Sequence, residues 1–410
     1  MKSETPDVIE EDVLISSQFY IMATAFLALF AVVGFACYGL PFYYDFLSND
    51  FGWSRTVVTS GNAVGKLLVG PLFGCLAGYL IDFYGPRKLM MTGALFAGVA
   101  LIGLSLSSSL STFFLFCVMN AVGYVLCGPL PCQVIISRWF DNNRGKAMGI
   151  AYLGIGVGGA IVPLLSASLE KRFGWHIALM SLGIFVIIIA FPMAFFIRDP
   201  AQARFEKVKS EINVPFKEIL QNRNFYLLAI GSLLSIGSVG GIGAHLKYYL
   251  RDINYTQVEA AHVMSAVLVA SLAGRVLMGF LADLICRKYV MLMLYLFVAG
   301  SIPLLLLPAF SGRIILFSIL FGVGIGGNYM IIPLMVADLF GVRALGRTMG
   351  IILVADGIAE AVLPMLVGAL YNAPTKSYAT GFIVLIFLTL LGAILISLLP
   401  AKAMIKAIKN

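Results

Sequence analysis

The chain alternates long apolar runs with short breaks that are charged or rich in Gly, Pro and Ser. A helix crosses the hydrocarbon core of a bilayer with about 17–25 residues, and each of these runs is long enough to do so. We therefore expect an all-α membrane protein with twelve spans, at residues 19–46, 56–83, 89–107, 112–140, 147–170, 177–197, 225–250, 257–282, 289–307, 314–340, 349–371 and 379–399. An even number of spans places both termini on the same side of the membrane.

Composition agrees with this pattern and narrows the functions. The 410 residues are 60% hydrophobic and 12% charged, whereas soluble domains are about 45–50% apolar. The twelve spans leave too few residues for a separate catalytic domain. The six cysteines lie in or beside apolar runs without a CxxC pair, and no triad of catalytic residues is visible. We expect no enzyme activity, no metal site and no cofactor.

The positive charges indicate how the chain is oriented. Of the 28 lysines and arginines, 19 fall at the termini, in the stretch 198–224 and in the even-numbered loops. Lysine and arginine mark the cytoplasmic side of membrane proteins, so both termini are expected in the cytoplasm. The net charge of +8 then reflects topology and does not indicate a nucleic-acid partner. The acidic N-terminal 14 residues do not resemble the basic start of a signal peptide.

The two halves of the chain match each other at an offset of 201 residues. Gly78-Tyr-Leu-Ile-Asp82 returns as Gly279-Phe-Leu-Ala-Asp283, the Met-Gly pair ending at Gly149 returns at Gly350, and Pro163 matches Pro364. Parallel repeats of six helices are typical of transporters that bind their substrate between two bundles. We expect bundles at residues 1–197 and 225–410, joined by a cytoplasmic loop at 198–224.

One of these repeats also resembles a known family signature. The loop between the second and third spans is similar to that of the major facilitator superfamily, with the sequence Gly78-x-x-x-Asp82-x-x-Gly85-x-Arg87-Lys88. Within that family, three segments resemble the branch of monocarboxylate transporters and oxalate:formate antiporters, namely Phe51-Gly52-Trp53, Phe173-Gly174-Trp175 and Arg275-Val-Leu-Met-Gly279. The two Phe-Gly-Trp segments also fit an ordinary aromatic belt at the membrane interface. The resemblance covers nearly the whole chain and implies two rocking six-helix bundles.

The resemblance assigns a gating role to charged residues at the cytoplasmic helix ends. In the family such residues latch the outward-open state, which here implicates Asp82, Arg87, Arg144 and Asp283. The alternative is that the basic residues of these loops only determine topology.

Four ionisable residues lie well inside predicted spans: Lys66, Arg275, Asp356 and Glu360. Each would cost at least about 2.5–3.5 kcal/mol if it faced lipid, so they are expected to face the interior. We estimate depth in the membrane from the helical rise of about 1.5 Å per residue, counted from the cytoplasmic end of each span. On this count Arg275 and Asp356 lie at the same depth, and Lys66 and Glu360 lie together at a depth nearer the outside. We predict that Lys66 and Glu360 pair between the two halves.

Arg275 is the predicted anchor for an anionic substrate. Its guanidinium presents a planar fork that matches a carboxylate, and the family resemblance implies the same role for an arginine at this place. A static pair with Asp356 is the alternative. The oxalate:formate antiporters generally have a lysine near residue 356, so the acid found here favours a monoanion. Because burial favours the neutral acid and a neighbouring cation favours the carboxylate, Asp356 or Glu360 is the predicted proton site.

Uncharged polar residues at mid-depth complete the predicted cavity, which in this superfamily is lined by the first, fourth, seventh and tenth helices. They are Asn120, Tyr124, Asn328 and Tyr329, with His245 near the outer end of the seventh span. Each could instead cross-link packed helices.

Together these residues predict a secondary active transporter of a small monocarboxylate such as lactate or pyruvate, coupled to protons and working by alternating access. The expected partners are the carboxylate anion, the proton and the bilayer of the cell membrane, and we expect a monomer. The alternatives are exchange of organic anions and, less in keeping with the short termini, a sensor that binds its ligand without moving it.

Overall fold

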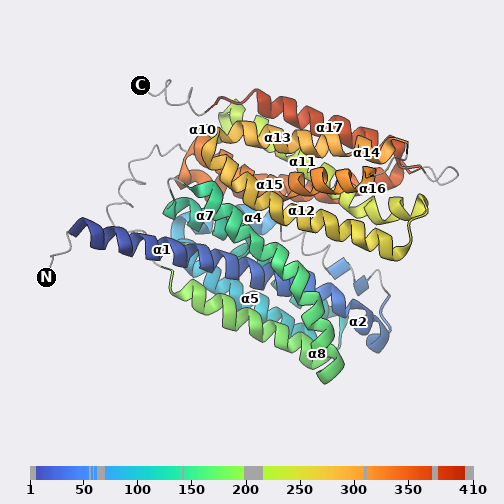
Figure 1. The fold of residues 1–410 in the computed structure, drawn as a ribbon. Coiled ribbons are helices and arrows are strands. Elements are labelled where there is room, and N and C mark those ends of the chain that lie inside the picture. The colour runs from blue at the N-terminus through green and yellow to red at the C-terminus, as the bar shows by residue number, and fades with distance from the viewer. Residues whose placement is uncertain are drawn as a thin grey trace. The chain divides into compact units, whose positions relative to one another are not determined.

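The computed structural model describes residues 6–54, 57–58, 60–61, 70–140, 143–197, 216–308, 312–371 and 377–401. Within these ranges the chain is helical and contains no β-strand, which confirms the predicted fold class (Figure 1). By its contacts the chain forms two compact units, Met1–Val69 with Tyr79–Ser210 and Gly70–Gly78 with Glu211–Asn410. The predicted boundaries at 197 and 225 remain a prediction, because residues 198–215 are outside the described ranges.

The first unit contains most of the elements before residue 198. They are α1 (Pro6–Leu29), the π-helix η1 (Phe30–Gly39), the 3₁₀-helix η2 (Leu40–Tyr43), α2 (Tyr44–Phe51), α4 (Gly70–Tyr84), α5 (Pro86–Leu106), α6 (Leu110–Cys127), α7 (Pro129–Trp139) and α8 (Arg144–Phe195). The segment Gly70–Gly78 of α4 is grouped with the second unit.

The second unit is also built from helices. Its elements are α10 (Phe216–Gln221), α11 (Arg223–Asp252), α12 (Gln257–Leu284), α13 (Arg287–Ser301), α14 (Pro303–Leu306), α15 (Arg313–Phe340), the 3₁₀-helix η4 (Val342–Ala344), α16 (Leu345–Ala369) and α17 (Ala379–Ser397). Their apolar faces meet in a core that includes Phe317, Phe321 and Phe382, all buried.

Ten helical segments of the described chain are long and apolar enough to cross a membrane. Two features account for the difference between these ten segments and the twelve expected spans. The expected span 56–83 lies partly outside the described residues, and α8 joins the fifth and sixth spans into one segment. Gly174, at φ 77°, is the only non-helical residue inside α8. The break expected between residues 170 and 177 is therefore a single glycine elbow, because a positive φ is accessible to glycine without steric cost.

The two Phe-Gly-Trp segments contact each other in the first unit. Gly52 ends α2 at φ 67°, and Gly174 divides α8 at φ 77°. The indole Nε1 of Trp175 donates to Asp50 Oδ2 at 2.6 Å, and the ring of Phe51 contacts both Trp53 and Trp175, with centroids 4.8 and 6.4 Å away. The two motifs therefore form a single aromatic cluster that joins α2 to the second half of α8.

Candidate functional site

At the ends of α4 and α7 the structure pairs Asp82 with a residue that the sequence did not single out. An oxygen of Asp82 lies 3.9 Å from Nη2 of Arg138. Arg87 instead places its guanidinium 5.0 Å above the ring of Phe195. Gly85, at φ 80°, makes the turn between α4 and α5 that separates the two charges. The acid and the base of the predicted latch thus have different partners.

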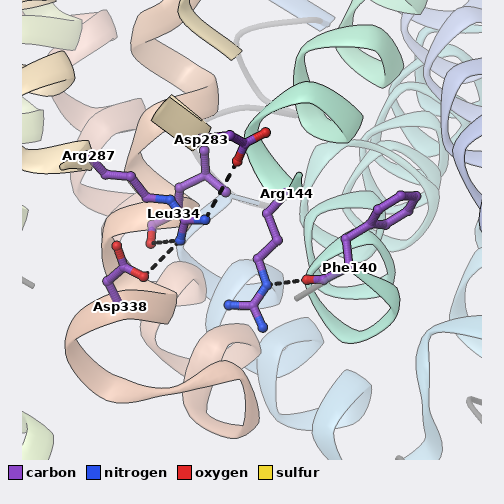
Figure 2. Close-up of polar contacts among 6 residues, drawn as sticks. All are labelled: Phe140, Arg144, Asp283, Arg287, Leu334 and Asp338. Carbon is purple, nitrogen blue, oxygen red and sulfur yellow. Dashed lines mark hydrogen bonds and ion pairs between the residues drawn. The ribbon is translucent and has the colours of Figure 1, made fainter. Parts of the chain in front are cut away.

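The corresponding end of the second unit holds a tighter cluster (Figure 2). Nη1 of Arg287 donates to Asp338 Oδ1 at 2.8 Å, and Nη2 lies 3.9 Å from Asp283 Oδ1. All three side chains are at most 7% exposed. Asp283 therefore binds Arg287 and shares it with Asp338 of α15, a residue that the sequence analysis missed.

Arg144 begins α8 and is 8% exposed. Its Nε donates to the backbone carbonyl of Phe140, just after the end of α7 (Figure 2). This bond ties the start of α8 to the preceding turn. The gating role of Arg144 stays a prediction, as do those of Asp82, Arg87 and Asp283.

Arg275 lies in the middle of α12 and is half-buried. Here α12 packs closely against α15, because Gly326 has no side chain and a Cβ there would stand 3.0 Å from the backbone nitrogen of Arg275. A close backbone approach of this kind fixes the depth of the Arg275 side chain relative to the polar residues of α15.

Asp356 faces α11 and does not pair with Arg275. The side chain is 3% exposed, and its Oδ1 accepts a hydrogen bond from the hydroxyl of Ser232 at 2.8 Å. Its second oxygen, Oδ2, is buried without a hydrogen-bond partner in the described part of the protein. The static Arg275–Asp356 pair considered as an alternative is thus not formed, because α16 turns this acid toward α11.

Glu360, one helical turn after Asp356, is half-buried and accepts a hydrogen bond from the hydroxyl of Tyr329 on α15. Lys66, its predicted partner, lies outside the described residues, so the pair remains untested. The neighbouring Asn328 is fully buried and donates from Nδ2 to Ser235 Oγ of α11 at 2.9 Å. Of the two polar residues predicted on α15, Tyr329 thus holds an acid and Asn328 cross-links helices.

Asn120 of α6 donates from Nδ2 to the backbone carbonyl of Ala36, at 3.1 Å, within the π-helix η1. A π-helix pairs each carbonyl with the N–H five residues later. For Ala36 that residue is Pro41, which has no N–H. The amide of Asn120 therefore supplies the donor that Pro41 lacks. Tyr124, one turn further along α6, is half-buried.

His245, toward the end of α11, is half-buried and contacts α16. Its Nε2 lies 2.9 Å from the carbonyl oxygen of Pro364, and its ring centroid is 5.4 Å from that of Tyr378. Tyr371 follows α16 and donates to Asp252 Oδ2 at 2.9 Å. Burial, reinforced by the charge of Asp252, raises the pKa of Tyr378 to about 12. His245 thus belongs to an aromatic cluster between the ends of α11, α16 and α17.

The sequence analysis missed the residues that hold the predicted ones in place. Ser232 and Ser235 hold Asp356 and Asn328. Serine is common in apolar helices and usually bonds its own helix, so composition does not distinguish these two. The arginine and aspartate near the ends of α7 and α15, Arg138 and Asp338, are charged residues beside repeated motifs and could have been found on that basis.

These observations define a multi-pass membrane protein in which two helical units bury charged and amide side chains within apolar helices. The Major Facilitator Superfamily model matches residues 24–261 and 228–405. The chain belongs to the major facilitator superfamily, as its loop signature suggested.

Relatives and solved structures agree with this assignment. The chain is 28% identical over 364 residues to the agnestins efflux protein AgnL12 of Paecilomyces divaricatus, covering 83% of this chain and 78% of that protein. It is 25% identical over 367 residues to human monocarboxylate transporter 12, covering 80% and 70%. The proton:xylose symporter XylE has a similar fold, with a TM-score of 0.72 at 17% identity, over 94% of this chain and 97% of that chain.

Proposed function

We propose that this transporter moves small monocarboxylates across the cell membrane together with protons, with both termini in the cytoplasm. The observation that carries the proposal is the set of ionisable residues inside the apolar helices of the second unit. Arg275 lies within α12, and Asp356 and Glu360 lie one turn apart within α16. In such an environment the cation can bind an anionic substrate, and one of the two acids can bind a proton.

Arg275 anchors the substrate carboxylate in this proposal. Its guanidinium keeps its charge in a poorly hydrated site and donates two parallel hydrogen bonds to a carboxylate. It is half-buried, so a small ligand can reach it. A single arginine within α12 matches a single negative charge on the ligand.

Glu360 and Tyr329 are the other polar residues of the second unit that we assign to the site. The hydroxyl of Tyr329 donates to Glu360, and both side chains are partly exposed. Asn328 and Ser235 are fully buried and bound to each other, so they shape the wall and do not contact the ligand. The ligand roles expected for Asn120 and Tyr124, on α6 of the first unit, stay predictions; one N–H of Asn120 is bonded to Ala36.

The name of one relative supports a carboxylate as the substrate, and the names of the relatives differ in the direction of transport. Human monocarboxylate transporter 12 is one of them, and another is named an efflux protein for agnestins. Exchange of organic anions is therefore the second candidate, because an efflux or exchange protein with the same anion site would not need a proton.

Transport in proteoliposomes tests the proposal. Vesicles containing the purified protein are assayed for uptake of labelled lactate, pyruvate, formate and oxalate, with and without an inward proton gradient. We expect accumulation of lactate or pyruvate above equilibrium only with the gradient, and little uptake of oxalate. Counterflow of oxalate or formate that ignores the gradient would favour the exchanger. No saturable uptake of any of the four would reject a monocarboxylate carrier.

A further inference from the structure

The environment of Asp356 differs from that of the other buried acids of the second unit. Asp283 and Asp338 are also nearly inaccessible, but each lies beside the guanidinium of Arg287, at 3.9 and 2.8 Å. Asp356 is 3% exposed and has no cation beside it in the described part of the chain. An ionised carboxylate buried without a cation costs several kcal/mol. Such a group is stable when it carries a proton.

The hydrogen bonds of Ser232 are compatible with a protonated Asp356. The serine Oγ is 3.0 Å from the carbonyl oxygen of Ala229 and 2.8 Å from Asp356 Oδ1. A hydroxyl has one hydrogen, and the carbonyl oxygen of Ala229 can only accept. The hydroxyl can therefore serve Asp356 in both states: it donates to Oδ1 of the carboxylate, and when Asp356 carries the proton it accepts from Oδ1 and donates to Ala229.

The remaining neighbours of Asp356 also favour the neutral acid. Tyr295 of α13 is fully buried, and its hydroxyl has no hydrogen-bond partner in the described structure. The charge that acts on Asp356 from its own helix is that of Glu360, another acid. Gly392 of α17 lies against the ring of Tyr295, and Gly231 of α11 lies against Gly392; neither carries a side chain. None of these groups can neutralise a carboxylate.

We propose that Asp356 is a proton-binding site buried between α11, α13 and α16, and that its proton is the one exchanged during transport. The inference rests on the proposed function and assigns the coupled proton to Asp356 in place of Glu360. When the proton leaves Asp356 for water, the carboxylate keeps the negative charge. The hydrogen of Ser232 then turns from Ala229 to Oδ1. Release therefore requires α16 to separate from α11 far enough to admit water.

Infrared spectroscopy of the purified protein tests the site without any substrate. A protonated carboxyl gives a C=O band that ionised carboxylates lack and that shifts in heavy water. We expect such a band in the wild type, its loss in Asp356→Asn and its retention in Glu360→Gln, the matched control one turn away. Ser232→Ala keeps the acid and is expected to shift the band. A band that persists in Asp356→Asn, or that disappears only in Glu360→Gln, overturns the assignment.

A transport measurement tests whether this proton is the coupled one. In proteoliposomes that show proton-driven uptake, Asp356→Asn is expected to lose accumulation above equilibrium while counterflow of preloaded substrate stays measurable. Accumulation retained in Asp356→Asn overturns the coupling role. The infrared result stands apart from the choice of substrate, so a failure of the monocarboxylate proposal and a failure of the proton site give different outcomes.

Discussion

Arginine and lysine carry the same charge, but only arginine offers two parallel N–H groups to a carboxylate. Replacing Arg275 by lysine therefore removes at least one charge-assisted hydrogen bond, of about 1.5–3 kcal/mol. We expect uptake at low substrate concentration to fall about 10- to 100-fold in Arg275→Lys, and further in Arg275→Ala. Initial rates in proteoliposomes measure this.

The control for this change is Arg251→Lys, because Arg251 is an exposed arginine at the end of α11. It is expected to leave uptake unchanged. Full activity with lysine at position 275 would reduce Arg275 to a generic positive charge, and an unchanged KM in Arg275→Ala would remove it from the binding site.

A second residue-scale expectation concerns Tyr378, which directly precedes α17. Burial, and then the charge of Asp252, raise its pKa from 10.0 to about 12. The folded protein thus favours the neutral phenol, and the resulting stability is complete below pH 10 and lost as the pH rises from 10 to 12. We expect the unfolding temperature to fall more steeply over this interval in the wild type than in Tyr378→Phe.

Tyr226→Phe is the matched control, because Tyr226 lies near the start of α11 and is 49% exposed. Its unfolding temperature should follow the wild type across the same pH interval. Equal slopes in wild type and Tyr378→Phe would contradict the role given to this phenol.

At the scale of the elements, apolar run length predicted the spans well, because a helix in lipid must satisfy its own backbone and have a minimum length. Details within a span were not predictable in the same way. The sequence gives no signal for the π-helix η1, and counting residues predicts the depth of a side chain but not its direction. The common depth of Asp356 and Arg275 therefore stays a prediction, while the structure turns Asp356 toward Ser232.

The bond between Asn120 and Ala36 yields a prediction for the π-helix. Asn120→Ala leaves the buried carbonyl of Ala36 without a donor and is expected to destabilise the protein by about 1–3 kcal/mol. In a Pro41→Ala background the backbone N–H of residue 41 can serve that carbonyl, so the same substitution should cost less. Unfolding measurements on the four proteins of this double-mutant cycle give the coupling energy.

Pro129→Ala provides the comparison, because Pro129 opens α7 at a position where a missing N–H leaves no carbonyl unpaired. Combined with Asn120→Ala it should give additive losses. Additive losses with Pro41→Ala as well would show that Asn120 does not replace the missing donor.

For the whole molecule, the sequence predicts that Lys66 and Glu360 pair between the two halves of the repeat. Each single neutralisation, Lys66→Met or Glu360→Gln, would leave an uncompensated charge in the membrane if the two groups meet. We expect the double variant to transport better than either single variant. Glutamine keeps an oxygen that can accept from Tyr329, so the local bond of Glu360 is preserved.

The measurement is the initial uptake rate of the three variants at equal amounts of inserted protein. Losses that add in the double variant would mean that Lys66 and Glu360 do not interact. Lys171→Met combined with Glu360→Gln serves as a control, because Lys171 is an exposed lysine of α8 in the other half of the chain.

The elbow at Gly174 has a practical consequence for work on this protein. Helix continues on both sides of that one residue, from Arg144 to Phe195, so this side of the membrane presents no flexible stretch between the two spans. A protease cleavage site or an epitope tag inserted there would have to unwind a helix end. Proteases and reagents that require an extended stretch of chain should accordingly react poorly at this junction.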